Sequence, residues 1–170
     1  SYAGAEQRLN AQLRVAQLYR MRLDATGAER ALESARQLLP GAGPTLAGRY
    51  LLESSNVYVM RREYETAEQL VKEAVGVFRQ AGDARHAAIA SSDLGALYED
   101  VLKHELAEEW YRTALDELGH SGDNRNLANT TMNLAITLKS QGRIDESLKE
   151  FERALAIAEE TGDRRTQSTV

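Results

Sequence analysis

Residues 91–123 read SSDLGALYEDVLKHELAEEWYRTALDELGHSGD, and this stretch contains one complete helix–turn–helix unit. Its closing pair, Gly122-Asp123, recurs as Gly82-Asp83 and as Gly162-Asp163, at a spacing of forty residues in both cases. A constant period of this length predicts stacked repeats, because each unit is too small to bury its own apolar face and needs its neighbours to cover it.

The Gly-Asp pairs also predict where helices end and begin. Glycine accepts the left-handed backbone that closes a helix, and an Asp carboxylate accepts hydrogen bonds from the free N–H groups at the start of the next helix. We therefore expect one helix to stop at each Gly and another to begin after each Asp. Similar signals predict a first helix over about 3–23, Thr26 as the N-cap of the second helix, and a firm stop at Pro40.

Apolar residues recur every three or four positions along the chain, which is the spacing of a helix with one buried face. Proline occurs only at Pro40 and Pro44, and the turns and β-branched clusters of a sheet are missing. We predict an all-α fold in which antiparallel helix pairs stack as a solenoid. It forms a single domain over 1–170, with repeats at about 3–43, 44–82, 83–122 and 123–162, and with 163–170 as the start of a truncated or frayed further helix.

The composition disfavours several classes of function. Without cysteine the chain has no disulfide, no thiolate nucleophile and no Cys-ligated metal, and we expect a reducing compartment, the cytoplasm. The net charge of −5 argues against direct nucleic-acid binding, which needs a basic surface. The longest apolar runs are only a few residues, so we expect no membrane span. A start at Ser1 without Met is compatible with a fragment of a longer protein.

Two short motifs in the third repeat identify a family. Leu94-Gly95-x-x-Tyr98 is followed by Ala107-x-x-x-Tyr111. This resembles the tetratricopeptide repeat (TPR) pattern of Leu-Gly-x-x-Tyr followed by Ala-x-x-x-Phe. Small residues are needed where the two helices of a pair touch, and bulky residues fill the space against the next repeat.

The other repeats match the pattern in the same register. Ser55 and Tyr58 take the Gly and Tyr places in the second repeat, and Ala135 and Leu138 take them in the fourth. Repeats of forty residues with Gly-Asp junctions are similar to a TPR sub-family found in kinesin light chains, polarity adaptors and bacterial peptide-sensing regulators. The resemblance covers residues 3–162 and implies a right-handed superhelical solenoid that binds proteins or peptides.

In this family the first helix of each repeat lines a concave groove. Amide side chains in such a groove can bond to a peptide backbone of any sequence, and Leu52, Val59 and Met132 would offer apolar pockets. We therefore predict a protein or peptide partner, with the alternative that some of these residues face solvent or the next repeat. The predicted groove residues are Gln17, Arg20, Arg49, Leu52, Asn56, Val59, Ser92, Ala96, Glu99, Asp100, Asn129, Met132, Asn133 and Lys139.

The third repeat is the acidic one, with nine acidic and three basic side chains over 84–123. Asp93, Glu99 and Asp100 lie on its first helix. Charge complementarity favours a partner that places Lys or Arg opposite Glu99 and Asp100. The alternative interpretation is a solvated helix face without a partner. The same carboxylates would repel a C-terminal carboxylate, which argues against the chaperone-tail clamp that some members of the family carry.

No catalytic motif is present in the sequence. It contains no Gly-x-Ser-x-Gly elbow, no His-Glu-x-x-His zinc helix and no glycine-rich phosphate loop. His86, His104 and His120 are far apart near helix ends, where capping or surface roles outweigh metal ligation. We therefore expect no enzyme, no cofactor and no metal.

Two functional hypotheses stay open at this point. The first is a non-enzymatic scaffold that presents its groove to an extended peptide or a partner helix. The second is a sensory or regulatory segment of a larger protein, controlled by a peptide or by homo-oligomerisation through the uncapped C-terminal end after Gly162. Flanking sequence would separate them, because the second predicts an attached DNA-binding, kinase or cyclase module.

Overall fold

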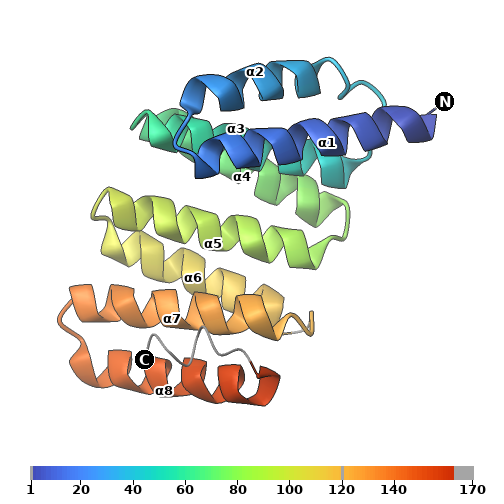
Figure 1. Cartoon of the computed structure of the whole chain (residues 1–170). Coiled ribbons are helices and arrows are strands. Elements are labelled where there is room, and N and C mark those ends of the chain that lie inside the picture. Colours follow the sequence, from blue (N-terminus) through green and yellow to red (C-terminus); the bar gives the residue numbers. More distant parts are fainter. Residues whose placement is uncertain (1, 120, 163–170) are drawn as a thin grey trace. The chain divides into compact units, whose positions relative to one another are not determined.

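The computed structural model describes residues 2–119 and 121–162 (Figure 1). Within these ranges the chain forms eight helices and no strand, which confirms the all-α prediction. The further helix predicted over 163–170 lies outside the described residues. In chain order the helices are α1 (Tyr2–Met21), α2 (Ala25–Arg36), α3 (Pro44–Met60), α4 (Tyr64–Gln80), α5 (Ala84–Asp100), α6 (His104–Leu118), α7 (Asn124–Ser140) and α8 (Ile144–Thr161).

The helices form two compact units, unit 1 with α1–α4 up to Asp83 and unit 2 with α5–α8 from Ala84 onward. In unit 1, α1 packs on α2 and α3 on α4, and α3 also contacts α1 and α2. In unit 2, α5 packs on α6 and α7 on α8, and α7 also contacts α6 and α5. The boundary between the units falls at the predicted Gly82-Asp83 junction, while the division of a single domain into four repeats stays our proposal.

Each helix pair turns through one residue with left-handed backbone. The φ angle is 58° at Leu23, 62° at Arg62, 58° at Leu102 and 78° at Gly142. A Cβ atom disfavours this region, so only Gly142 adopts it without a steric cost. The left-handed residue occupies the same place in every pair, which agrees with the forty-residue period.

The glycines of the Gly-Asp junctions have the backbone that was predicted for them. The φ angles of Gly82, Gly122 and Gly162 are 70°, 69° and 67°. After Gly122, the N-cap of α7 is Asp123, whose Oδ1 accepts a hydrogen bond from the backbone N–H of Asn126 at 3.2 Å. The prediction is confirmed at this junction, whereas Asp163 lies outside the described residues.

The start of α2 differs from the prediction. The predicted N-cap Thr26 is wrong, because α2 begins at Ala25 and Thr26 already lies inside the helix. Asp24 is the N-cap, and its Oδ1 accepts a hydrogen bond from the backbone N–H of Gly27 at 2.8 Å. One of the free N–H groups in the first turn of α2 is thus satisfied by a carboxylate.

Glycines mark the closest contacts between paired helices. A Cβ added at Gly95 of α5 would lie 2.6 Å from the Tyr111 ring of α6, and one added at Gly48 of α3 would lie 2.5 Å from the Phe78 ring of α4. Both rings are buried. Each therefore packs directly on the backbone of its partner helix, which confirms the expected contact of small against large residues.

Candidate functional site

All the predicted groove residues lie on the first helix of a pair, that is on α1, α3, α5 or α7. The structure divides them between the two units, and each set is described by itself. In unit 1, Gln17 and Arg20 lie on α1 with four more residues on α3. In unit 2, four lie on α5 and four on α7.

A buried ion pair joins α1 and α3 in unit 1. The Nε atom of Arg20 lies 3.5 Å from the Oε2 atom of Glu53. Both atoms are inaccessible to solvent, and neither makes a hydrogen bond. Charged groups in such a place are normally hydrogen-bonded, because burial without a partner costs free energy. The two facing atoms are therefore under-satisfied where no solvent reaches them, and only the exposed parts of the two side chains, 32% and 19%, can meet further polar groups.

A second arginine and an amide extend this polar cluster. The Nη1 atom of Arg49 on α3 donates a hydrogen bond to Oδ1 of Asn10 on α1 at 3.0 Å. Burial raises the pKa of Glu53, and the positive charges of Arg20 and Arg49 oppose that rise. We name Asn10, Arg20, Arg49 and Glu53 the α1–α3 polar cluster.

A cavity of about 300 Å³ lies beside the α1–α3 polar cluster. Its lining residues are Glu6, Gln7 and Asn10 of α1 and Leu46 of α3. The Oε1 atom of Glu6 accepts a hydrogen bond from the backbone N–H of Gly43 at 3.4 Å, which ties the start of α3 to α1. The volume is at the lower end of the range for small ligand sites, about 300–1,000 Å³.

The remaining unit 1 residues of the predicted set differ in accessibility. Gln17, Asn56 and Val59 are half-buried and keep accessible surface. Leu52 is only 8% exposed and belongs to the core. The surface between α1 and α3 is therefore more polar than the predicted groove with its Leu52 pocket.

In unit 2, a hydroxyl contact links α5 to α7. Thr130 Oγ1 donates a hydrogen bond to Oγ of Ser92 at 3.3 Å. Met132 and Asn133 are half-buried beside this contact along α7. The other members of the predicted set on these helices are exposed, apart from Glu99; they are Ala96, Asp100, Asn129 and Lys139.

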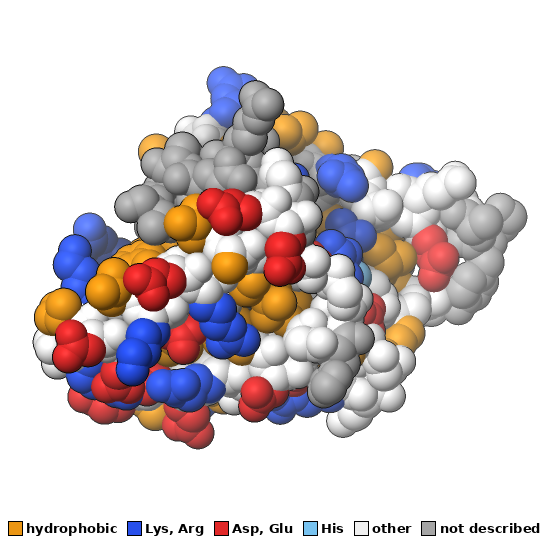
Figure 2. All heavy atoms as spheres, turned by 90° about the horizontal axis from the view of Figure 1, so that it is seen from below, with side chains coloured by type: hydrophobic (Ala, Val, Ile, Leu, Met, Phe, Trp, Pro, Cys, Tyr) orange, Lys and Arg blue, Asp and Glu red, His pale blue; other side chains and the backbone are white. Residues whose placement is uncertain are grey.

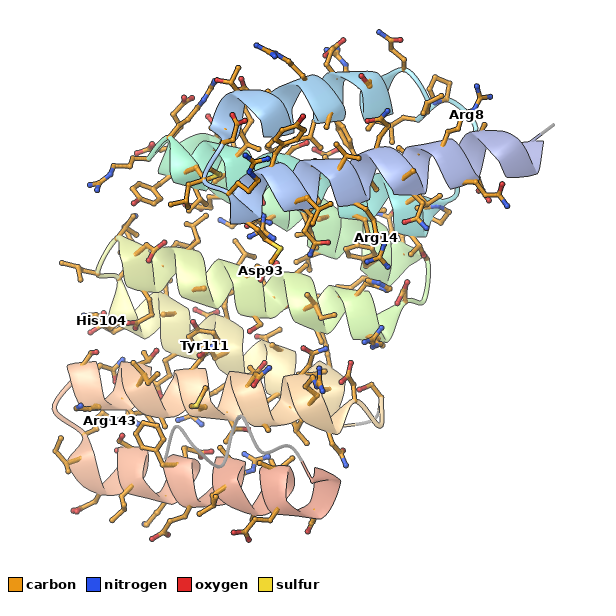
Figure 3. All side chains as sticks on the ribbon, in the orientation of Figure 1. Arg8, Arg14, Asp93, His104, Tyr111 and Arg143 are labelled. Atoms are coloured by element: carbon orange, nitrogen blue, oxygen red, sulfur yellow. The ribbon has the colours of Figure 1, made fainter. Side chains whose placement is uncertain are left out.

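The charges of three acidic residues of α5 act on the buried hydroxyl of Tyr111. Burial of Tyr111, followed by the charges of Glu99, Asp93 and Asp100, raises the pKa of its hydroxyl far above the ordinary value. Figure 3 labels Asp93 on α5 and Tyr111 on α6. Glu99 Oε1 also lies 2.9 Å from Nδ1 of His104 at the start of α6. Of the predicted pair of carboxylates, Glu99 is therefore half-buried with a histidine partner, whereas Asp100 is exposed.

An arginine-rich network holds the turn between α7 and α8 against α6. Arg143 Nη1 donates a hydrogen bond to Oε2 of Glu108 at 2.6 Å, and Arg112 Nη2 donates to Oε1 of the same carboxylate at 2.8 Å. Burial alone would raise the pKa of Glu108, but hydrogen bonds from Arg112, Gln141 and Arg143 outweigh it and hold the pKa below the ordinary value. Every oxygen of Glu108 has a partner, so this network serves packing.

Sequence reasoning missed two members of the α1–α3 polar cluster, Asn10 and Glu53. A usable signal was present, because Glu53 follows Arg49 by one helical turn and places opposite charges on one face of α3. The partner on the other helix, Arg20, could be recognised only once the two helices were placed side by side.

Within the described part of the chain, no group of three or more His, Cys, Asp or Glu side chains is placed to hold a metal ion. None of the described helices is long and apolar enough to cross a bilayer.

The family described as soluble NSF attachment protein, SNAP, matches residues 5–168 of the chain. Solved structures with a similar fold include aspartyl phosphate phosphatase F from Bacillus subtilis, which is 12% identical with a TM-score of 0.90 over 96% of this chain and 43% of that one. A Rap protein complexed with competence and sporulation factor is 15% identical, with a TM-score of 0.88 over 98% of this chain and 46% of that one. A Podosopora anserina kinesin light chain with TPR-like repeats is 16% identical, with a TM-score of 0.73 over 91% of this chain and 76% of that one.

These likenesses show the fold, a TPR-like helical repeat, and confirm the family resemblance found in the sequence. The chain spans less than half the length of phosphatase F and of the Rap protein. No protein with a curated description matches the sequence significantly.

Proposed function

The chain belongs to the soluble NSF attachment protein (SNAP) family, and from this premise we propose that it is a non-catalytic module that binds a protein or peptide partner. TPR-like folds of this kind are generally scaffolds for protein interaction. One structure with the same fold, the Rap protein, is a complex with competence and sporulation factor. A cytoplasmic location is part of the same proposal.

We place the binding surface of unit 1 on α1 and α3. The observation that carries this choice is the ion pair of Arg20 and Glu53, whose side chains are still 32% and 19% exposed, so that parts of both charged groups stay within reach of a partner. A peptide that crosses these helices brings backbone N–H and C=O groups, which are the partners that a carboxylate and a guanidinium need. Gln17 and Asn56 add amide groups that bond to either kind of backbone atom.

The proposal is tested with peptides selected from a random 12-residue library displayed on phage. Gln17→Ala should weaken the affinity of the selected peptides about fivefold, the loss expected for one hydrogen bond of about 1 kcal/mol. Gln69→Ala is the matched control, because Gln69 is an exposed glutamine on α4. Titration calorimetry measures both variants. Equal affinities of the wild type and both variants would move the binding surface away from α1 and α3.

In unit 2 we propose that the α5 carboxylates meet a basic segment of the partner. The charges of Glu99 and Asp100 already act on the buried Tyr111 hydroxyl. Glu99→Lys together with Asp100→Lys should abolish binding of a Lys- or Arg-containing peptide and should leave a neutral peptide unaffected. Insensitivity of the basic peptide to both changes would leave these carboxylates as a solvated face.

The second candidate function is a sensory or regulatory segment of a longer protein. It is favoured by the comparison with the Rap protein, because this chain covers only 46% of the length of that protein. The regulatory form of the proposal includes homo-oligomerisation through α8, where Ile144 is 60% and Leu148 is 57% exposed. Figure 2 views the molecule from the side of α8 and shows hydrophobic side chains there among charges of both signs.

Sedimentation velocity over a range of concentrations tests the homo-oligomer. A dimer that dissociates when Leu148 is replaced by Asp would support it. Leu102→Asp is the control, because Leu102 is 76% exposed on the turn before α6. A monomer at every concentration would leave the scaffold as the better candidate.

A further inference from the structure

A second cavity in unit 1 lies on the side of α3 that faces α2 and α4, away from the α1–α3 polar cluster. Its volume is about 370 Å³, which falls within the range of small ligand sites. Leu32 of α2, Val57 of α3 and Leu70 of α4 supply apolar walls, and the rings of Tyr50 and Tyr58 lie beside them. An apolar group of the size of an aromatic ring fits such a lining.

One polar group in this cavity has no partner. Ser54 lines the cavity, is 9% exposed, and its Oγ atom makes no hydrogen bond. Across the described ranges seven Ser and Thr side chains are buried, and the other six bond to a carbonyl, a carboxylate or another hydroxyl. The neighbour Ser55 donates to the carbonyl of Leu52 at 2.8 Å. The Ser54 hydroxyl is the exception: its oxygen is closed off from solvent without a partner, in a residue that lines a cavity.

The repeat register shows that Ser54 is a departure from the pattern. It stands in the place of Leu in the motif Leu-Gly-x-x-Tyr, which Leu94 and Leu134 occupy in the third and fourth repeats. Both of those leucines are fully buried. Exchange of a buried leucine for serine removes apolar volume and adds a hydroxyl.

At two other positions that line the cavity, unit 1 also has a smaller or more polar side chain than unit 2. Leu32 corresponds to Tyr111, and Arg36 corresponds to Leu115. Tyr111 and Leu115 are buried against the rest of unit 2, whereas Arg36 is exposed at the rim of the cavity. Unit 2 thus carries larger or more apolar side chains at the positions that line the cavity of unit 1.

We propose that this cavity is a binding site for a tyrosine side chain carried by a partner polypeptide. The apolar walls accept the ring. A phenolic hydroxyl both donates and accepts, so it can bond to the Ser54 hydroxyl once rotation about χ1 turns that group toward the cavity. The rim favours a polypeptide as the carrier of the ring, because Glu33 and Arg36 lie there 3.9 Å apart and are largely exposed. Glu33 can accept a hydrogen bond from a backbone N–H group of the partner, and Arg36 can donate one to a backbone carbonyl, on either side of the tyrosine. This site is separate from the surface proposed on α1 and α3.

The test uses N-acetyl-tyrosinamide as the probe and follows the backbone amide signals of the whole chain by heteronuclear NMR. The probe should shift the signals of residues around Ser54 in a saturable manner. Ser54→Leu, which restores the residue found in the third and fourth repeats, should fill the cavity and weaken binding at least tenfold. Ser54→Ala keeps the cavity open and should weaken binding about fivefold through loss of one hydrogen bond.

Ser55→Ala is the matched control, because it removes a neighbouring buried hydroxyl that already has a partner and does not line the cavity. It should bind the probe within twofold of the wild type. N-acetyl-phenylalaninamide should bind to the wild type about fivefold more weakly than the tyrosine probe does. The two probes should bind to Ser54→Ala with equal affinity.

Several results would overturn the proposal. Equal affinity of the wild type for the tyrosine and phenylalanine probes would remove the role of the Ser54 hydroxyl. Binding of p-cresol without binding of N-acetyl-tyrosinamide would assign the cavity to a free small phenol. Absence of any shift around Ser54 at saturating probe, or full binding by Ser54→Leu, would remove the site.

Discussion

Unit 1 and unit 2 are built from the same helix pair, yet they carry different side chains beside their second helices. In unit 2, Leu134 and Tyr111 are buried, and the Tyr111 ring rests on Gly95. In unit 1 the corresponding positions carry Ser54 and Leu32, and a cavity lies between them. The helix pair itself therefore needs only a few contacts of small against large residues, so other positions are free to become polar.

The connection after α2 contributes to the difference. α2 ends at Arg36, and the segment that follows contains Pro40 and Pro44. In unit 2, α6 continues to Leu118, and it packs more extensively against α7 than α2 does against α3. A shorter second helix covers less of the next pair, which leaves room for the cavity in unit 1.

The largest effect is expected where unit 2 is most tightly packed. Gly95→Leu places a side chain where even a Cβ would lie 2.6 Å from the buried Tyr111 ring. Overpacking of this kind should lower the free energy of unfolding by about 3 kcal/mol. Urea unfolding followed by circular dichroism measures the loss.

Lys103→Ala is the control for this prediction, because Lys103 is exposed in the turn of the same helix pair. Its cost should stay below about 0.5 kcal/mol, as for most exposed substitutions. If the two variants lost equal stability, the assignment of Gly95 to the contact between α5 and α6 would be wrong.

The contact between Gly95 and Tyr111 was predictable because it depends on residues within one repeat. The forty-residue period, the helix pairs and the Gly-Asp junctions were predictable for the same reason, since each is set by local pattern and backbone conformation. The wrong prediction of Thr26 as the N-cap of α2 shows what a local sequence pattern cannot decide. Thr26 and Asp24 both have capping side chains, and their choice depends on where the preceding turn through Leu23 ends.

The candidate sites were less predictable than the fold. Helical periodicity identified which face of α3 carries Arg49 and Asn56, but not that Glu53 meets Arg20 from another helix. The sequence shows Ser54 in the place of a leucine, yet whether neighbouring side chains close the resulting space depends on three helices at once. Which of the predicted groove residues bind a partner stays a prediction.

The intermediate effect concerns the two adjacent serines of α3. Ser54→Ala removes a buried hydroxyl without a partner and should raise the free energy of unfolding by about 1 kcal/mol. Ser55→Ala removes a hydroxyl that is bonded to the Leu52 carbonyl, and it should lower that free energy by about 1 kcal/mol. Urea unfolding of both variants gives the two signs. A loss of stability in Ser54→Ala would mean that this hydroxyl has a partner in solution.

The smallest effect is a difference in pH dependence between the buried carboxylates of the two units. Burial raises the pKa of Glu53 in unit 1, so its contribution to stability is present at low pH and is lost as the pH rises through that raised pKa. Hydrogen bonds hold the pKa of Glu108 in unit 2 below its ordinary value. Its contribution is present above the unfolded pKa and is lost as the pH falls through the folded one.

Unfolding in urea at a series of pH values between about 3.5 and 7.5 separates the two carboxylates. As the pH rises, Glu53→Gln should gain stability relative to the wild type, because the variant has no charge to desolvate. Glu108→Gln should lose stability relative to the wild type over the same range, because the wild-type carboxylate becomes charged between Arg112 and Arg143. If both variants lost stability relative to the wild type as the pH rises, Arg20 and Arg49 would neutralise Glu53 as fully as the arginines of unit 2 neutralise Glu108. The α1–α3 polar cluster would then have no unmet need for a partner, and the binding surface proposed there would lose its physical basis.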